Sequence, residues 1–154
     1  MPEWECDKVS LKETISNDIK AALLSGNRFR GEVLKNFKAT MLNEEVAKNK
    51  RETGLDDNEI EQLLAREIKK RNESADIYEK SGRKDLADNE LAEKQVLAEY
   101  MPKQLDESEI KKVVDEVIAS TDSPNMGQVI GVVKSKLGNS ADGSVIARIV
   151  KESL

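Results

Sequence analysis

Apolar residues recur along this chain at the spacing of an α-helix, and no segment shows the strict alternation of a half-buried β-strand. The clearest case is a run of five aliphatic residues at i, i+3, i+4, i+7 and i+8, namely Ile110, Val113, Val114, Val117 and Ile118. Glycine and proline, which interrupt helices, number only 8 and 3 in 154 residues. The pattern therefore predicts an all-α protein.

Helix-boundary signals divide the chain into seven expected helices. Ser10 with Glu13, and Asp106 with Glu109, have the spacing of a capping box at a helix start. Gly26, Gly82 and Pro102 mark helix ends. In the second expected helix, which begins at Arg28 and extends to Lys50, one apolar stripe is expected to face the core and a second set of residues to widen it: Phe29, Val33, Phe37 and Met41, then Leu34, Leu42 and Val46.

The composition changes after Pro102, which predicts two helical domains. We expect a four-helix N-terminal domain over residues 10–102 and a small three-helix C-terminal domain over 103–154. The short Pro102–Leu105 segment would let them reorient. Residues 1–9, with Trp4 and Cys6, are expected to be a disordered leader, and we assign them no role. Without a signal peptide or an apolar run long enough to span a bilayer, the chain is expected to be a soluble cytoplasmic protein with no membrane partner.

The chain contains no histidine and one cysteine, which excludes several common kinds of site. Catalytic triads, His-containing metal sites and disulfide frameworks all need residues that are missing here. We therefore expect no metal, no cofactor and no catalytic centre built on these groups. Aromatic residues are only 3% of the chain, which argues against modules that stack the bases of single-stranded nucleic acid.

The net charge of −5 is unevenly distributed. Residues 28–51 carry seven basic and three acidic side chains, and residues 126–154 carry Lys134, Lys136, Arg148 and Lys151 against Asp142 and Glu152. These segments fit either solvated helix surfaces or local basic faces that bind phosphates.

Charged residues also fall on the expected inner faces of two neighbouring helices. On the third expected helix, Glu67 and Arg71 share a face with Leu64 and Ile68. On the fourth, Glu90 and Glu93 share a face with Leu86 and Leu97. One interpretation is a carboxylate pair for acid–base chemistry or for metal binding. The other is a structural ion network that fixes the register of the two helices.

Gly127 and Gly131 lie at i, i+4 on a short expected helix, and no phosphate-binding glycine motif is present. The two glycines fit close helix packing within the protein. Alternatively, small residues let a large partner approach the backbone while nearby basic side chains bind its phosphates.

Several long motifs resemble the YqeY family. The first runs from Arg71 through Tyr78 and Gly82-Arg83 to Leu86, followed by Glu90, Glu93 and Tyr100-Met-Pro102-Lys-Gln104-Leu105. The others are Met126-Gly127-Gln-Val-Ile-Gly131, Gly138-Asn-Ser-Ala-Asp142-Gly143 and Val150-Lys151-Glu-Ser-Leu154. The resemblance covers nearly the whole chain from Leu11. Gln128 stands where the family commonly has a lysine.

The resemblance implies an all-helical, two-domain protein whose C-terminal half is similar to the tail domain of GatB, a subunit of a tRNA-dependent amidotransferase. In that enzyme the tail helps to hold the tRNA, whereas the chemistry takes place elsewhere. The family is commonly described as having carbon–nitrogen ligase activity with glutamine as amido-N-donor. This chain contains no nucleotide-binding motif.

Three functional hypotheses follow. The first is a tRNA-binding accessory module without its own catalytic centre, with contacts from Lys134, Lys136, Asn139, Ser140, Arg148 and Lys151 and an extended footprint from basic residues in 28–51. The second is an adaptor that docks on an amidotransferase or on a translation-related protein. The third is a stand-alone carbon–nitrogen ligase that uses Glu90 and Glu93.

Overall fold

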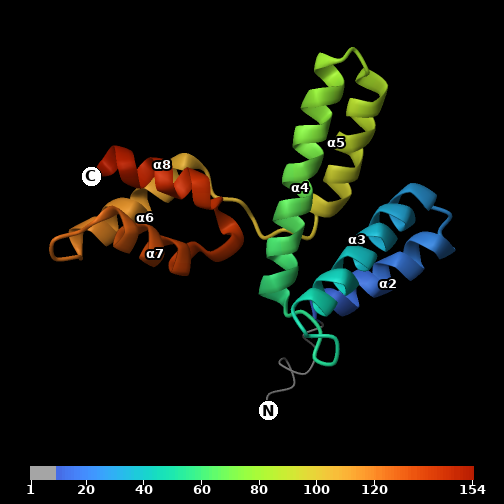
Figure 1. Cartoon of the computed structure of the whole chain (residues 1–154), viewed down its shortest axis with the longest axis horizontal. Coiled ribbons are helices and arrows are strands. Elements are labelled where there is room, and N and C mark those ends of the chain that lie inside the picture. Colours follow the sequence, from blue (N-terminus) through green and yellow to red (C-terminus); the bar gives the residue numbers. More distant parts are fainter. Residues whose placement is uncertain (1–9) are drawn as a thin grey trace. The chain divides into compact units, whose positions relative to one another are not determined.

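The structure is a computed structural model, shown in Figure 1, and it describes residues 10–154. Over this range the chain forms seven α-helices and one short 3-10 helix, with no β-strand, which confirms the all-α prediction. The expected leader, with Trp4 and Cys6, lies outside the described residues. Two compact units divide the chain, the first ending at Tyr100 and the second running over Met101–Leu154. None of the described helices is both long enough and apolar enough to cross a membrane.

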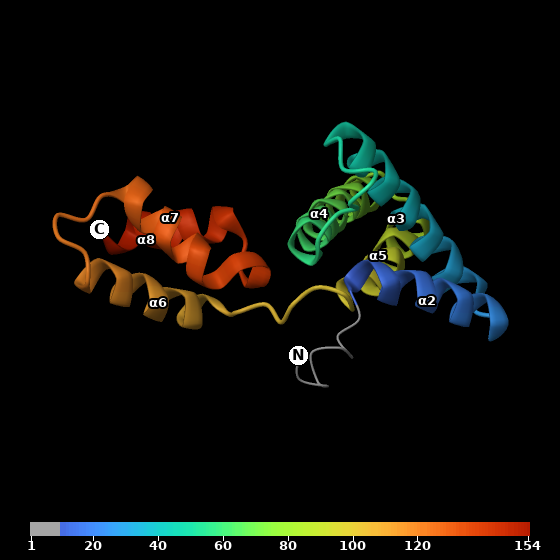
Figure 2. The same ribbon diagram turned by 90° about the horizontal axis from the view of Figure 1, so that it is seen from below.

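The N-terminal unit consists of two antiparallel helical hairpins. The first pairs α2 (Leu11–Leu24) with α3 (Arg28–Ala47), and the second pairs α4 (Asp57–Lys80) with α5 (Lys84–Ala98). Each hairpin is closed by a short turn that contains a glycine in the left-handed backbone region, Gly26 at φ 80° and Gly82 at φ 77°. The hairpins pack together through α3 with α5 and α2 with α4, as Figures 1 and 2 show.

The four helices of the N-terminal unit bury a set of mainly aliphatic side chains. Its fully buried members come from all four helices and include Ile15, Leu34, Met41, Ile60, Leu64 and Leu97. Burying such side chains stabilises the fold by roughly 1.5–3 kcal/mol each. Helix starts are capped as their sequences suggest: Ser10 Oγ accepts the Glu13 N–H, and Asp56 with Glu59 forms a full capping box at α4.

Three residues expected in the core of the second helix are exposed instead. Phe29, Leu42 and Val46 are 41%, 48% and 59% exposed. They lie at the edges of the apolar stripe, while α2 and α5 cover its centre, where Val33, Leu34, Phe37 and Met41 are buried. The prediction for these three residues is therefore wrong, because periodicity gives the direction of a face but not how much of it is covered.

The C-terminal unit consists of α6 (Glu107–Ala119), α7 (Met126–Leu137), a 3-10 turn η1 (Gly138–Ser140) and α8 (Gly143–Ser153). All three helices contribute to its core of eight valines and isoleucines: Ile110, Val114, Val117, Val129, Val133, Ile146, Ile149 and Val150. The predicted capping box of Asp106 and Glu109 is present at the start of α6.

Candidate functional site

The outer face of α7 is exposed and carries two glycines. Gly127, Gly131 and Ser135 follow at i, i+4 and i+8 and form one stripe along the helix, opposite the buried Val129 and Val133. All three stripe residues are exposed. Lys134 and Lys136 lie about 100° to either side of Ser135, at the C-terminal end of the stripe.

The two helical glycines do not serve packing within the unit. A Cβ placed on Gly131 meets no atom within 4 Å, and one placed on Gly127 meets only Asn125 Oδ1, at 3.7 Å. The interpretation as close helix packing is therefore wrong at these positions. A glycine in a helix interior destabilises the helix by roughly 0.5–1 kcal/mol relative to alanine. At Gly131 no packing contact within the described chain offsets this cost.

The candidate basic residues of this unit differ in how their charges are neutralised. Arg148 forms ion pairs with Glu107 and, at 3.6 Å, with Glu152. Lys134, Lys136 and Lys151 are exposed, and no carboxylate in the described part of the chain pairs with them. The Lys134 side chain extends to the start of α8, where its ammonium lies 3.3 Å from the point that a Cβ on Gly143 would occupy. Lys134, Lys136 and Lys151 are therefore the cations best able to bind an external anion.

Asn139 and Ser140 lie in the turn η1, directly after α7, and both are half-buried. Gln104 Nε2 donates to the Asn139 carbonyl at 2.9 Å, and the Leu105 N–H donates to the Ser140 carbonyl at 2.9 Å. The segment that precedes α6 thus holds this turn through backbone carbonyls, which leaves the Ser140 hydroxyl for other contacts.

On α4 and α5 the structure brings together three of the four residues of the expected ion network. Arg71 Nη1 donates to Glu67 Oε2 at 3.0 Å, and Arg71 Nε lies 3.3 Å from Glu93 Oε2. Arg71 Nε is buried and makes no hydrogen bond, so the contact with Glu93 is an ion pair without one. Within residues 10–154, Glu90 makes no ion pair with Arg71. No group of three or more metal-ligating side chains occurs in the described part of the chain.

A buried carboxylate elsewhere in the unit was missed by sequence reasoning. Glu45 is 1% exposed, and its carboxylate accepts a hydrogen bond from Lys12 Nζ at 2.7 Å and from the Leu55 N–H at 3.4 Å. It ties α2 and the loop before α4 to the end of α3. The signal was present, because Glu45 follows Met41 at i+4 on the inner stripe.

A second cluster missed from the sequence joins the end of α5 to the first hairpin. Tyr100 Oη donates to Asp18 at 2.5 Å and accepts from Arg30 Nη2 at 2.9 Å, while Arg30 Nη1 binds Glu99 at 2.5 Å. Burial, and then the bond to Asp18, raises the pKa of the Tyr100 hydroxyl above its ordinary value. The hydroxyl therefore stays protonated, and the cluster is structural. Its members lie far apart in sequence, so spacing alone could not reveal it.

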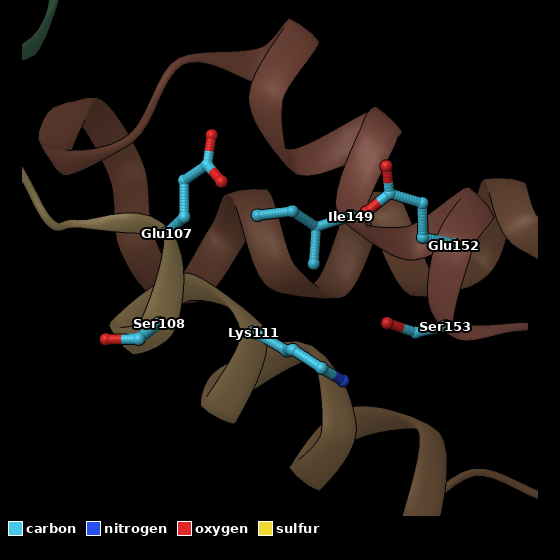
Figure 3. Close-up of a pocket in the computed structure, with 6 residues that line it drawn as sticks. All are labelled: Glu107, Ser108, Lys111, Ile149, Glu152 and Ser153. Atoms are coloured by element: carbon cyan, nitrogen blue, oxygen red, sulfur yellow. The ribbon is translucent and has the colours of Figure 1, made fainter.

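A shallow pocket of about 210 Å³ opens between α6 and α8, with Ile149 on its wall (Figure 3). Figure 3 shows its other lining side chains, which are Glu107, Ser108, Lys111, Glu152 and Ser153. Lys111 pairs with Asp115 at 3.1 Å, and Ser108 Oγ donates to Asp106 Oδ1 at 2.7 Å. The hydroxyl of Ser108 thus takes part in the capping of α6 by Asp106.

Together these features define an all-helical protein with an open, lysine-flanked helix face and with charge clusters that tie helices together. A family model for the Yqey-like protein family matches residues 12–154. The chain belongs to the YqeY-like family. A search of curated proteins finds no match.

Proposed function

We propose that this protein binds folded tRNA as an accessory module of amidotransferase-type tRNA chemistry, without a catalytic centre of its own. The observation that carries the proposal is the open α7 face, where a Cβ on Gly131 would meet no atom and Lys134 and Lys136 lie at the C-terminal end of the stripe. Exposed small residues let an RNA backbone come close to a helix, and lysines beside it bind phosphates. Recognition by shape and backbone suits a chain with few aromatic residues.

Membership of the YqeY-like family supports this proposal. The resemblance implies that the family's C-terminal half is similar to the tail domain of GatB, which helps to hold tRNA in that enzyme. The contacts are assigned to Lys134, Lys136 and Lys151, with Asn139 and Ser140 at the adjoining turn. Arg148 contributes less, because Glu107 and Glu152 already neutralise it.

Charge reversal on α7 tests the proposal directly. Lys134→Glu with Lys136→Glu should weaken binding of folded tRNA at least tenfold at low salt and make binding less salt-dependent, since fewer counterions are released. Fluorescence anisotropy with labelled tRNA measures both effects. A matched control reverses Lys69 and Lys112, two exposed lysines elsewhere, and should change affinity little. Equal losses in both variants would reject a site on α7.

Substitution of the open glycine separates binding from folding. Gly131→Ala should raise the free energy of unfolding by roughly 0.5–1 kcal/mol, because alanine favours helix and the Cβ meets no atom. The same change should weaken tRNA binding, since the methyl group holds the RNA away from the backbone. Urea denaturation and anisotropy on one preparation give the two values. A stabilised variant with unchanged affinity would contradict the proposed contact.

A second candidate function, a protein-binding adaptor, is favoured by apolar side chains around the turn between α2 and α3. Leu24 is 90% exposed, Leu23 is 53% exposed, and Phe29 lies just after the turn. An amidotransferase or another translation-related protein would dock there through apolar contacts. Such a complex should survive high salt and the α7 charge reversals, whereas tRNA binding should not. Co-purification at low and high salt distinguishes the two functions.

A further inference from the structure

The structure divides six of the seven basic residues of the segment 28–51 into two groups, and the seventh, Arg51, is exposed in the loop after α3. Arg30 pairs with Glu99 at 2.5 Å, Lys48 lies 3.5 Å from Glu59, and Lys50 lies 2.7 Å from Glu59. These three cations hold elements of the N-terminal unit together. Their charges are neutralised within the fold, so the excess of positive charge in the sequence overstates what an external ligand meets.

The second group lies together on the outer face of α3. Arg28, Lys35 and Lys38 have no carboxylate partner in the described chain. On the helical wheel Arg28 and Lys35 are exposed and lie opposite the buried Phe37, whereas Lys38 is half-buried and lies to one side of them. Ten residues of helix span about 15 Å, so the three charges form a short row along the axis.

One acidic side chain interrupts this row. Glu32 is exposed on the same face, one turn after Arg28. The face therefore keeps an excess of two positive charges in a protein whose net charge is −5. A local excess of this kind attracts polyanions although the whole molecule repels them.

We propose that this row, Arg28, Lys35 and Lys38 on α3, is a second RNA-backbone-binding face, located on the N-terminal unit and separate from the α7 face. The inference rests on the proposed function, because it takes folded RNA as the ligand. The row consists of cationic side chains, which pair with phosphates, so its contacts are to the RNA backbone. It contributes affinity and salt dependence but no sequence preference.

The test measures tRNA affinity of the full-length protein over a series of salt concentrations. Arg28→Glu with Lys35→Glu and Lys38→Glu should weaken binding at least tenfold at low salt and lower the slope of log affinity against log salt by about two. The matched control reverses Lys69, Lys80 and Lys84, three exposed lysines of the α4–α5 hairpin. The control should keep most of the affinity, and circular dichroism should show both variants folded.

A single substitution provides a test in the opposite direction. Glu32→Gln removes the acidic interruption and should tighten tRNA binding about two- to threefold, which a surface without a role in binding would not do. This variant keeps the side-chain size and is exposed, so a folding defect is not expected.

The outcomes separate this inference from the proposed function. If the α7 variant loses affinity while the α3 triple variant and Glu32→Gln match the wild type, the α3 face is rejected and the proposed function stands. If the wild-type protein does not bind tRNA, both fail. If poly-L-glutamate competes for the α3 face as well as tRNA does, the face is a general anion surface or a site for acidic proteins, and the inference is overturned.

Discussion

At the scale of single residues, buried charge in this protein holds helices together. Glu45 is the one charged residue buried among the described residues, and its contacts come from Lys12 and the Leu55 N–H. A buried carboxylate needs such partners, because an unpaired charge in the interior is costly. The same logic applies to Arg71 between Glu67 and Glu93, although those side chains are less buried.

Removing the cation from the Glu45 pair should destabilise the fold more than removing both charges. Lys12→Met is expected to lower the free energy of unfolding by about 2 kcal/mol, since it leaves Glu45 with only its backbone donor. The double variant with Glu45→Met should recover much of this loss. Urea denaturation of both variants measures the difference. Equal stability of the single variant and the wild type would show that the pair contributes nothing.

The partners of these charged side chains could be predicted from the sequence only in part. The spacing placed Glu67, Arg71 and Glu93 on facing helices, and the structure joins them, whereas Glu90 shares the face without pairing with Arg71. Helical periodicity gives a residue's direction but not its reach along the neighbouring helix. The Asp18–Tyr100 bond joins residues 82 positions apart, and no local pattern encodes such a contact.

At the scale of elements, the start of α4 combines a helix cap with a tie to the preceding loop. Glu59 accepts from the Asp56 N–H at 3.3 Å in the capping box and from Lys50 Nζ at 2.7 Å. The Lys50 hydrogen bond, and then the Asp56 N–H, lower the pKa of Glu59 from 4.5 to about 2. The cap thus depends on an ionised carboxylate.

This arrangement predicts a pH-dependent contribution to stability. Because the folded-state pKa lies below the ordinary value, the stabilisation is complete above pH 4.5 and is lost as pH falls toward 2. Glu59→Gln should remove that contribution, so its unfolding free energy should approach that of the wild type as pH falls through this window. Urea denaturation at several pH values between 6 and 2 measures the gap. A gap that stays constant across the window would mean that Glu59 does not titrate as described.

Elements were more predictable than faces. Capping signals and turn glycines located all seven helices, because those signals act within a few residues. The exposure of Phe29, Leu42 and Val46 depended instead on which neighbours cover α3, and the open environment of Gly131 depended on the absence of a neighbour over α7. These are properties of packing between distant segments, which propensity and periodicity do not contain.

At the scale of the whole molecule, each of the two compact units buries its own set of apolar side chains, as an independently folding domain does. The C-terminal unit has its own core of eight valines and isoleucines. A fragment of residues 101–154 should therefore be helical and unfold cooperatively, although with low stability because so short a chain buries a small share of its surface. Circular dichroism during heating tests this. A fragment without a cooperative transition would mean that the unit needs the rest of the chain to fold.

The open environment of Gly131 also has a consequence for protein engineering. Selection for heat resistance rewards Gly→Ala changes in helices, and this position accepts a methyl group without a clash. A library screened only for thermostability should therefore enrich alanine at residue 131 early. Because the proposed function uses this glycine to bind a partner, the stabilised variants should bind that partner less well. The residue at position 131 would then indicate whether selection acted on stability or on binding.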